Sequence, residues 1–323
     1  MELSDLKKAM KGVDIILFTP FNKDGSLDLE GMRTNIRWLL ERTAGKDFIF
    51  TPLGSGSEAY TQSDDERNAV IKMVVEEVNG QHPVMAGTGK AGTQETVKLC
   101  QSANSIGADG AMVVLPYYHV PTEEGMYQHY KQVAEGVDKD FGIMIYNNQF
   151  VSDAWIKPPL MARLSKIPNI IAVKENITNM ASYYAMQRAL DPDDMVTLCG
   201  TGPVVYSCMA QYGARGFISF PANYAPERAY SIYEAVTAGD SDKAIELINA
   251  MAPYSRFGGK VAANHGPHTG LSAAGGWMGL AVIKATMDIL GLRGGEVRLP
   301  LVGLTEEEKT ELRGILRTTG LLK

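Results

Sequence analysis

The chain has 323 residues, of which 45% are hydrophobic and 21% are charged, and its formal net charge is −6. This balance is typical of a soluble globular protein that is long enough to bury a large core without covalent cross-links. Acidic and basic residues are interspersed, and no run of Lys and Arg forms a surface that could follow phosphates, so we expect no nucleic-acid partner.

Cysteine usage and hydropathy both indicate a cytoplasmic protein. The three cysteines, Cys100, Cys199 and Cys208, have no CxxC spacing, so we expect buried or half-buried thiols in a reducing compartment. No apolar stretch approaches the length that crosses a membrane, and residues 1–12 have a polar, helical pattern instead of a signal peptide. We therefore expect no membrane partner.

Eight short apolar runs recur along the chain, and each ends in a cluster of Gly, Pro, Asn or Thr. The runs are nearly continuously apolar instead of alternating, which predicts strands that are covered on both faces. In chain order they span 15–21, 48–54, 83–89, 110–116, 142–148, 170–176, 195–202 and 216–223.

The segments between these runs carry helix-start signals. Polar capping residues followed by acidic residues begin the clearest helical stretches, which run 26–42, 63–79 and 122–137. Strands that alternate with helices in this way predict a (β/α)₈ TIM barrel. The alternative is a doubly wound open sheet. It would require a nucleotide-binding loop after the first strand, and the loop TPFNKDGS contains no GxGxxG motif.

The strand pattern stops near residue 241, and only helical patterns follow. These patterns cover 241–257, a stretch around 279–290, and 305–318. We therefore expect two parts, a barrel over residues 1–240 and a C-terminal helical extension over residues 241–323 that packs on the barrel.

Lys174 is the strongest candidate for chemistry. In such barrels the reacting groups lie at the carboxyl ends of the strands, and Lys174 follows the apolar residues 170–173, where a long cation has no packing role. Partial desolvation at the barrel mouth would favour its neutral, nucleophilic amine. The alternative is a lysine that extends to solvent or pairs with a loop carboxylate. Two other lysines, Lys90 and Lys284, are expected to face solvent.

Tyr146 ends the strand that precedes the strand of Lys174. Neighbouring parallel strands lie about 4.8 Å apart, so both side chains should reach the same mouth. A phenol beside an imine-forming amine can move protons while a carbinolamine forms and loses water. Taken alone, a tyrosine at this position more often anchors a strand end, and the pairing with Lys174 is what favours the catalytic interpretation.

The loop after the second run, residues 54–60, is rich in small residues. Such residues let backbone N–H groups converge on a carboxylate, and the hydroxyl of Ser55 could anchor substrate or relay a proton. Loops of this composition are also common as plain turns.

Two rival sites stay open at this stage. His265 and His268 have a spacing that could supply two metal ligands, but they lie in a Gly- and Pro-rich connection without an adjacent carboxylate, which favours a loop. The segment 199–202, Cys-Gly-Thr-Gly, follows the seventh run, where some barrels bind phosphate.

The motifs together resemble the dihydrodipicolinate synthase / N-acetylneuraminate lyase family of class I Schiff-base aldolases. The resemblance covers nearly the whole chain, and no single motif would suffice without the others. The motifs are TPFNKDGSLD (19–28), GSGSE (54–58), AGTG (86–89), LPYYHVPTEEGMYQHY (115–130), YNN (146–148), AVKEN (172–176) and LGLRGGEVRLPLVGLTEEE (290–308).

The resemblance implies roles for several residues. Lys174 would form the imine, and Tyr146 would be the general acid and base. Ser55 would relay protons between Tyr146 and Tyr118, which in the family reaches across a dimer interface. The family is commonly a homotetramer built as a dimer of dimers.

It also implies how a substrate is held. Ser55 and Gly56 would bind the carboxylate of a 2-oxo acid such as pyruvate, and Ile218 would line the site. The covalent lysine imine would replace any cofactor, and no metal is expected.

Three positions depart from the family pattern. Ser57 replaces the second Gly of the loop, and Gly56 lacks the second loop hydroxyl. Val151 stands where dihydrodipicolinate synthases carry an arginine that binds the carboxylate of the aldehyde substrate, and valine cannot replace that charge-assisted contact. The nearby amides, among them Asn148, suit hydroxyls or neutral polar groups instead.

We therefore expect a Schiff-base aldolase or lyase that acts on a small 2-oxo acid, with an aldehyde as its second partner. A sugar-acid dehydratase or aldolase and an aryl hydratase-aldolase of the same family are alternatives, as is a non-catalytic protein that binds a 2-oxo acid. If aspartate semialdehyde were the aldehyde, Arg256 or Lys260 would have to replace the missing arginine.

Overall fold

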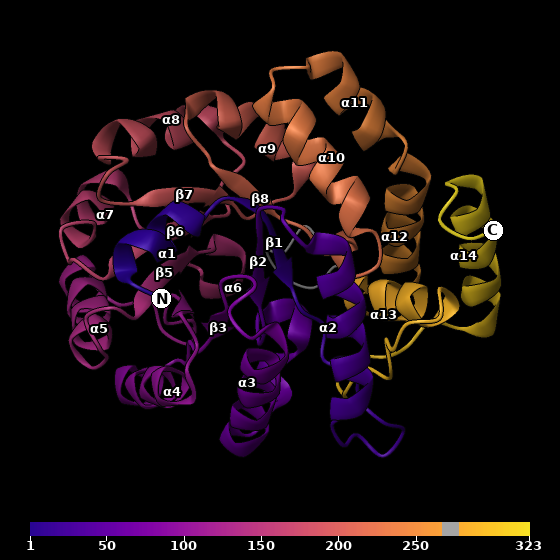
Figure 1. Cartoon of the computed structure of the whole chain (residues 1–323), viewed down its shortest axis with the longest axis horizontal. Helices are drawn as coiled ribbons and strands as arrows, with labels where there is room; N and C mark the ends of the chain where they lie inside the picture. Colours follow the sequence, from indigo (N-terminus) through magenta and orange to yellow (C-terminus); the bar gives the residue numbers. More distant parts are fainter. Residues whose placement is uncertain (267–277) are drawn as a thin grey trace.

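The strands form a closed parallel barrel that is surrounded by helices (Figure 1). The computed structural model describes residues 1–266 and 278–323, and within them eight strands pair in the order β2-β1-β8-β7-β6-β5-β4-β3. A parallel bridge between Phe50 and Val84 joins β2 to the start of β3 and completes the ring. The (β/α)₈ barrel predicted from the sequence is confirmed. The strands are β1 (Gly12–Ile16), β2 (Phe48–Thr51), β3 (Met85–Gly87), β4 (Gly110–Val114), β5 (Gly142–Asn147), β6 (Ile170–Glu175), β7 (Val196–Cys199) and β8 (Gly216–Ile218).

The helices between the strands begin where polar side chains cap their first turns. Ser63 forms a capping box at α3, and Thr122 caps α5. The first connecting helix begins at Leu29 and not at Ser26, because the carboxylate of Asp28 caps it. These outer helices are α2 (Leu29–Thr43), α3 (Asp64–Val78), α4 (Thr93–Ile106), α5 (Glu123–Glu135), α7 (Pro158–Leu164), α8 (Met180–Ala189), α9 (Pro203–Met209) and α10 (Pro226–Thr237).

The interior of the barrel is filled by side chains from alternate strand positions, as expected for a packed barrel. Helix α1 (Leu3–Ala9) adds Leu6 to this interior cluster, where it packs with residues such as Met85 and Met144. Short helices lie in the loops: η1 (Ser55–Ser57), η2 (Ala59–Thr61), α6 (Gln149–Ser152), η3 (Ala210–Tyr212) and η4 (Pro221–Asn223). The interior is therefore mainly apolar, and the polar loops stay at the rim.

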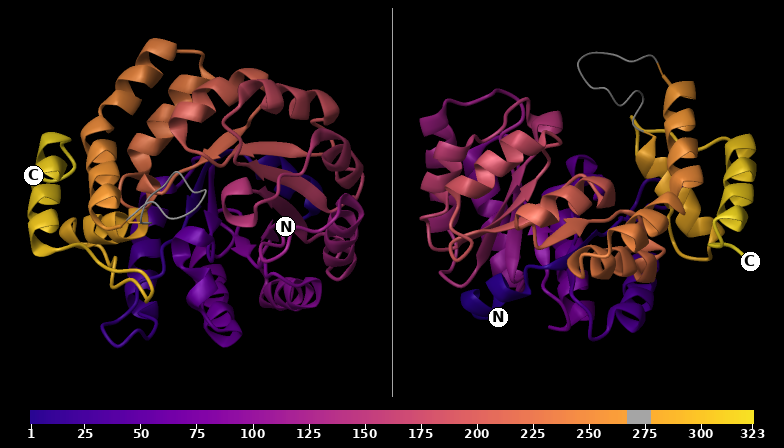
Figure 2. Two further views of the ribbon diagram at one scale, coloured as in Figure 1. Left: turned by 180° about the vertical axis from the view of Figure 1, so that it is seen from behind. Right: turned by 90° about the horizontal axis from the view of Figure 1, so that it is seen from above.

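The C-terminal helices lie to one side of the barrel (Figure 2). The predicted helix over 241–257 is in fact two helices, α11 (Ser241–Asn249) and α12 (Ala252–Asn264), because Pro253 can occupy only the first turn of a helix. A second hydrophobic cluster joins α12, α13 (Gly279–Ile289) and α14 (Glu306–Thr318) to Tyr224 after β8. Helix α11 packs instead against α9 and α10.

Two further properties of the described residues bear on the sequence predictions. Cys100 and Cys199 are buried thiols as expected, whereas Cys208 is exposed. Among residues 1–266 and 278–323, none of the helices combines the length and the hydropathy that a membrane-spanning helix requires.

A buried ion pair fastens the extension to the loop after β2. Glu58 and Lys284 are both buried, and the Lys284 Nζ lies 2.5 Å from the Glu58 Oε1. The second oxygen of Glu58 accepts the backbone N–H of Arg298 at 2.8 Å. The prediction that Lys284 faces solvent is wrong, because α13 is buried on all sides and its one lysine has an internal carboxylate as partner.

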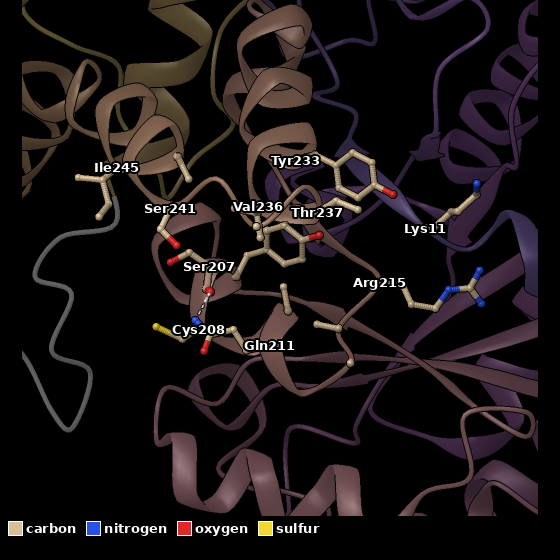
Figure 3. A pocket seen from close by; sticks show the side chains of 16 residues that line it. Lys11, Ser207, Cys208, Gln211, Arg215, Tyr233, Val236, Thr237, Ser241 and Ile245 are labelled. Atoms are coloured by element: carbon tan, nitrogen blue, oxygen red, sulfur yellow. Dashed lines mark hydrogen bonds between the residues drawn. The ribbon is translucent and has the colours of Figure 1, made fainter.

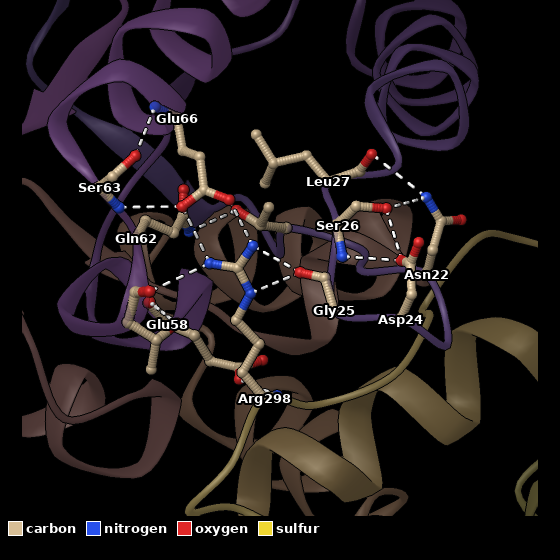
Figure 4. Close-up of polar contacts among 12 residues, drawn as sticks. Asn22, Asp24, Gly25, Ser26, Leu27, Glu58, Gln62, Ser63, Glu66 and Arg298 are labelled. Carbon is tan, nitrogen blue, oxygen red and sulfur yellow. Dashed lines mark hydrogen bonds and ion pairs between the residues drawn. The ribbon is translucent and has the colours of Figure 1, made fainter.

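Arg298 extends the same connection to two further loops (Figure 4). Its guanidinium donates to the Gly25 carbonyl at 2.6 and 2.8 Å, to the Thr61 carbonyl at 3.0 Å and to the carboxylate of Glu66. Charge-assisted contacts of this kind are directional, so they fix the position of the loop after β2 relative to the extension.

Replacing Lys284 by Met should destabilise the protein by about 3–5 kcal/mol, because the charge of Glu58 would then be buried without its partner. Urea unfolding followed by circular dichroism measures the change. The double variant with Glu58→Gln should lose clearly less than the sum of the two single variants. Additive losses would show that the pair is not coupled.

Candidate active site

A cavity of about 1000 Å³ opens at the carboxyl ends of the strands. Its lining includes five of the residues predicted from the sequence: Lys174, Tyr146, Ser55, Asn148 and Ile218. Lys174 comes from β6, Tyr146 from β5 and Ile218 from β8. Ser55 and Asn148 come from the loops after β2 and β5. Segments up to 163 residues apart in the sequence are therefore brought to one site by the barrel.

Lys174 and Tyr146 are directly paired residues of neighbouring strands. The Lys174 side chain is 3% exposed, its Nζ lies 3.7 Å from the centroid of the Tyr146 ring, and the Met112 Sδ is also 3.7 Å away. Within the described residues Lys174 forms no ion pair. The amine is held against an aromatic ring and a thioether in a nearly dry position, where a nucleophilic lysine is effective.

Asn148 orients the hydroxyl of Tyr146. The Oδ1 of Asn148 accepts the N–H of Phe150 at 2.9 Å, since Asn148 caps the short helix α6. Its Nδ2 is thereby directed to the Tyr146 hydroxyl, to which it donates at 2.7 Å. Because this oxygen already accepts a hydrogen bond, the hydroxyl proton stays available for a group bound in the cavity.

In the loop after β2, one hydroxyl faces the cavity, and the following residues are buried in the protein. Ser55 lines the cavity, whereas Gly56 is buried and is not among the lining residues. A Cβ at Gly56 would lie 3.2 Å from both Phe18 and Phe220, so a side chain there would require small shifts of these two rings. The hydroxyl of Ser57 donates to the Leu17 carbonyl, so it supports the loop and does not face the cavity.

Tyr118 is separate from these residues within the chain. Its side chain is 81% exposed and packs against His119, and Tyr117 lines the cavity in its place. The relay from Tyr146 through Ser55 to Tyr118 stays a prediction, because it requires a second subunit.

The far end of the cavity is partly apolar. Phe150 and Val151 line it and are 57% and 44% exposed. Arg67, which sequence reasoning missed, also lines the cavity, but its guanidinium is buried and donates to the Ala59 carbonyl. Burial lowers the pKa of Arg67.

The two basic residues suggested as replacements for the missing arginine are not part of the cavity lining. Lys260 instead pairs with Glu311 at 2.7 Å, and Arg256 is exposed on α12. The described part of the C-terminal extension therefore places neither cation in the lining.

Two buried carboxyl groups near the site were also missed. Burial raises the pKa of Asp14, in β1, to about 6, and the pKa of Glu175, beside Lys174 in β6, to about 7. Glu175 accepts from Asn147 at 2.8 Å and from the indole of Trp155 at 3.0 Å, so it holds the loop after β5 against β6. The sequence signal for both is an acidic residue at one end of an apolar run, since Asp14 directly precedes the run 15–21 and Glu175 lies near the end of the run 170–176.

The rival sites predicted from the sequence have different outcomes. His265 ends α12, and its Nε2 lies 2.8 Å from the Oε1 of Glu308, so a carboxylate is adjacent after all. His268 lies outside the described residues. Within the part that the structure describes, no three metal-binding side chains gather. The segment Gly200–Gly202 lines the same cavity as Lys174.

A second cavity, of about 830 Å³, lies between α9, α10 and α11 (Figure 3). It shares no lining residue with the first. Its two cations already have partners, since Lys11 pairs with Asp47 at 3.0 Å and Arg215 donates to the Lys8 carbonyl at 3.0 Å. Neither of its cations is therefore free, and its remaining reactive side chain is the thiol of Cys208.

Comparisons with known proteins agree with this geometry. Residues 9–256 match the Dihydrodipicolinate synthetase family. A 4-hydroxy-tetrahydrodipicolinate synthase of Methanoculleus marisnigri is 34% identical over 96% of this chain and 99% of its own.

Two solved structures are similar in fold and sequence. The chloride-inhibited dihydrodipicolinate synthase of Acinetobacter baumannii, complexed with pyruvate, is 28% identical with a TM-score of 0.82, over 97% of this chain and all of that one. YagE, an E. coli K12 prophage protein of the dihydrodipicolinic acid synthase family, also in complex with pyruvate, is 27% identical with a TM-score of 0.83, over 97% and 99% of the two chains.

Replacing Glu175 by Gln should flatten the pH dependence of stability. The raised pKa means that the folded state binds this proton more tightly than the unfolded chain. The contribution of the Glu175 proton to the free energy of unfolding is therefore complete below pH 4.5, and it is lost as the pH rises to about 7. The difference is of the order of 3 kcal/mol.

Urea unfolding between pH 5 and pH 8 measures this effect. The exposed variant Glu124→Gln, whose carboxylate pairs with Arg163, is the control and should keep the slope of the parent protein in this range. If the free energy of unfolding of Glu175→Gln changed with pH in parallel with that of the parent, the raised pKa of Glu175 would be contradicted.

Proposed function

The chain belongs to the dihydrodipicolinate synthetase family and is a lyase of that family, and we propose that Lys174 forms a Schiff base with pyruvate or another small 2-oxo acid. The observation that supports this most strongly is the nearly dry contact between the Lys174 amine and the Tyr146 ring at the mouth of the barrel. The pyruvate complexes of the two similar structures support the choice of substrate.

The reaction begins when the neutral amine of Lys174 attacks the keto carbon. A C–N bond forms, the carbonyl π bond breaks, and the oxygen takes a proton, for which the Tyr146 hydroxyl is the donor. The carbinolamine then loses water to give an iminium ion. This cation withdraws electrons from the adjacent C3, which loses a proton to the Tyr146 phenolate left by the first step. The enamine that results attacks the carbonyl carbon of an aldehyde through C3.

The loop after β2 is suited to hold the carboxylate. The backbone N–H groups of Ser55 and Gly56 donate to no other backbone group in the described chain, as expected at the start of the short helix η1. Together with the Ser55 hydroxyl they can bind a carboxylate that points away from Lys174. No cofactor or metal enters this scheme.

The second substrate is a hydroxylated or aryl aldehyde and not aspartate semialdehyde. Val151 and Phe150 line the position where a far carboxylate would need a cation, and the guanidinium of Arg67 is already directed to the Ala59 carbonyl. A sugar-acid or aryl branch of the family fits this lining. Tyr118, exposed in the single chain, completes the site in a homotetramer.

The first test is reductive trapping. Pyruvate with cyanoborohydride should add one reduced adduct, and peptide mass spectrometry should locate it on Lys174. Lys90, which pairs with Asp64 at 2.9 Å, is the internal control and should stay unmodified. An adduct on Lys90, or no adduct with any 2-oxo acid, would refute the assignment and favour a non-catalytic protein.

The second test concerns the aldehyde. The kcat/KM for aspartate semialdehyde should be about tenfold to a hundredfold below that for hydroxylated or aryl aldehydes, since a charged hydrogen bond contributes about 1.5–3 kcal/mol. Val151→Arg should narrow this difference, whereas Val151→Met should not. Efficient condensation of aspartate semialdehyde by the unmodified protein would overturn the proposal.

A further inference from the structure

Asp14 is a charged residue inside the barrel wall. It pairs with Ile49 of β2 and Ile218 of β8, and it shares its side of β1 with Ile16, whose side chain packs in the interior cluster. The alternation of a strand therefore directs the Asp14 carboxyl group into the barrel. Its side chain is completely buried, and it is not part of the cavity lining, so a substrate cannot reach it.

The carboxyl group has no hydrogen bond of regular geometry among the described residues, although both of its oxygens are buried. The Thr51 hydroxyl is close enough to lower its pKa, so Thr51 gives it a weak polar neighbour and not a full partner. Buried carboxyl groups are normally paired, because loss of water disfavours the charged form. An apolar side chain would be the expected occupant of this position, and packing alone gives no reason for an acid.

Lys174 is a cation of the same barrel interior, because Ile218, which pairs with Asp14 across β1 and β8, lines the cavity that holds Lys174. Burial raises the pKa of Asp14 to about 6, while the Thr51 hydroxyl and the Lys174 ammonium oppose the rise. The neighbouring strands β2 and β8 present Ile49, Thr51 and Ile218 to it, and none of these titrates in this range. Across the barrel the titratable groups are Lys174 and the Tyr146 that covers it.

We infer that Asp14 is a positioning residue for the reaction at Lys174, and that its buried carboxylate stabilises the positive charge on the lysine nitrogen. The inference rests on the proposed Schiff-base function. While Tyr146 keeps its proton, the direct contacts of that nitrogen, the Tyr146 ring and the Met112 sulfur, carry no formal negative charge. Asp14 supplies a negative charge that does not depend on the protonation of Tyr146 and does not touch substrate.

The Asp14 carboxylate has its strongest stabilising effect on the iminium ion. The amine that attacks the substrate is neutral, whereas the iminium is a permanent cation in a nearly dry site, and a carboxylate inside the barrel favours the cation over the carbinolamine. A nearby opposite charge typically shifts a pKa by about 1–3 units. A shift of this size corresponds to a change of about tenfold or more in the ratio of iminium ion to carbinolamine.

The test measures iminium formation as a function of pH. Protein with pyruvate is trapped by cyanoborohydride between pH 5 and pH 9, and the Lys174 adduct is quantified by mass spectrometry. In the parent protein the trapped fraction should fall as Asp14 takes up its proton near pH 6. Asp14→Asn should lower the trapped fraction about tenfold at pH 8 and remove the inflection near pH 6.

Two further variants separate this role from a structural one. Thr51→Val removes the hydroxyl that opposes the rise of the Asp14 pKa, so it should move the inflection to higher pH while the protein stays folded. Met144→Leu changes the packing of the same interior cluster without changing charge, and it should keep the parent profile.

The outcomes distinguish the two proposals. Absence of the Lys174 adduct in the parent protein would refute the Schiff-base function itself. Normal adduct formation with the same pH profile in Asp14→Asn and the parent would refute only the role of Asp14. If Asp14→Asn does not fold, an unshifted inflection in Thr51→Val refutes it equally.

Discussion

The contact between the Lys174 amine and the Tyr146 ring depends on strand register. The two residues are direct partners across β5 and β6, and both point into the barrel because strand positions alternate between its two faces. A shift of one residue in either strand would direct one side chain outward among the helices. The pairing of Lys174 with Tyr146 is thus a consequence of how the apolar runs align. The loops after the strands add polar groups to the site.

The loops are fixed by polar contacts that come from distant parts of the chain. Asn148 caps α6 and orients the Tyr146 hydroxyl with the same amide, while Glu175 holds the following segment through Asn147 and Trp155. On the other side, the buried pair of Glu58 and Lys284 ties the loop after β2 to the C-terminal extension. The extension therefore supports the loop that we propose to bind the carboxylate, although its helices contribute no reacting group.

The sequence was informative where a residue is unusual for its local pattern. Lys174 and Tyr146 end apolar runs, and the barrel then requires them to be neighbours, so their meeting could be predicted. The family resemblance gave Ser55 and Ile218, and both line the cavity. Asp14 was missed because its run was taken to begin at Ile15, and Lys284 was misplaced because a helical pattern does not show which sides are covered.

Other features depend on tertiary contacts that no local pattern contains. The closeness of Phe18 and Phe220 to Gly56 is one such feature, because these residues meet only when the barrel is assembled. The partner of His265, Glu308, is 43 residues away in the sequence. The complete burial of Asp14 depends on β2 and β8 on either side of β1, and it is not visible in any one of the three strands.

The central claim is that Lys174 turns a 2-oxo acid into an enamine with Tyr146 as proton donor. Exchange of the C3 protons of pyruvate with D₂O, followed by proton NMR, tests it without any second substrate. We predict exchange with the parent protein, none above background with Lys174→Ala, and a rate about 10²–10⁴ lower with Tyr146→Phe. Exchange that persists in Lys174→Ala would contradict the account.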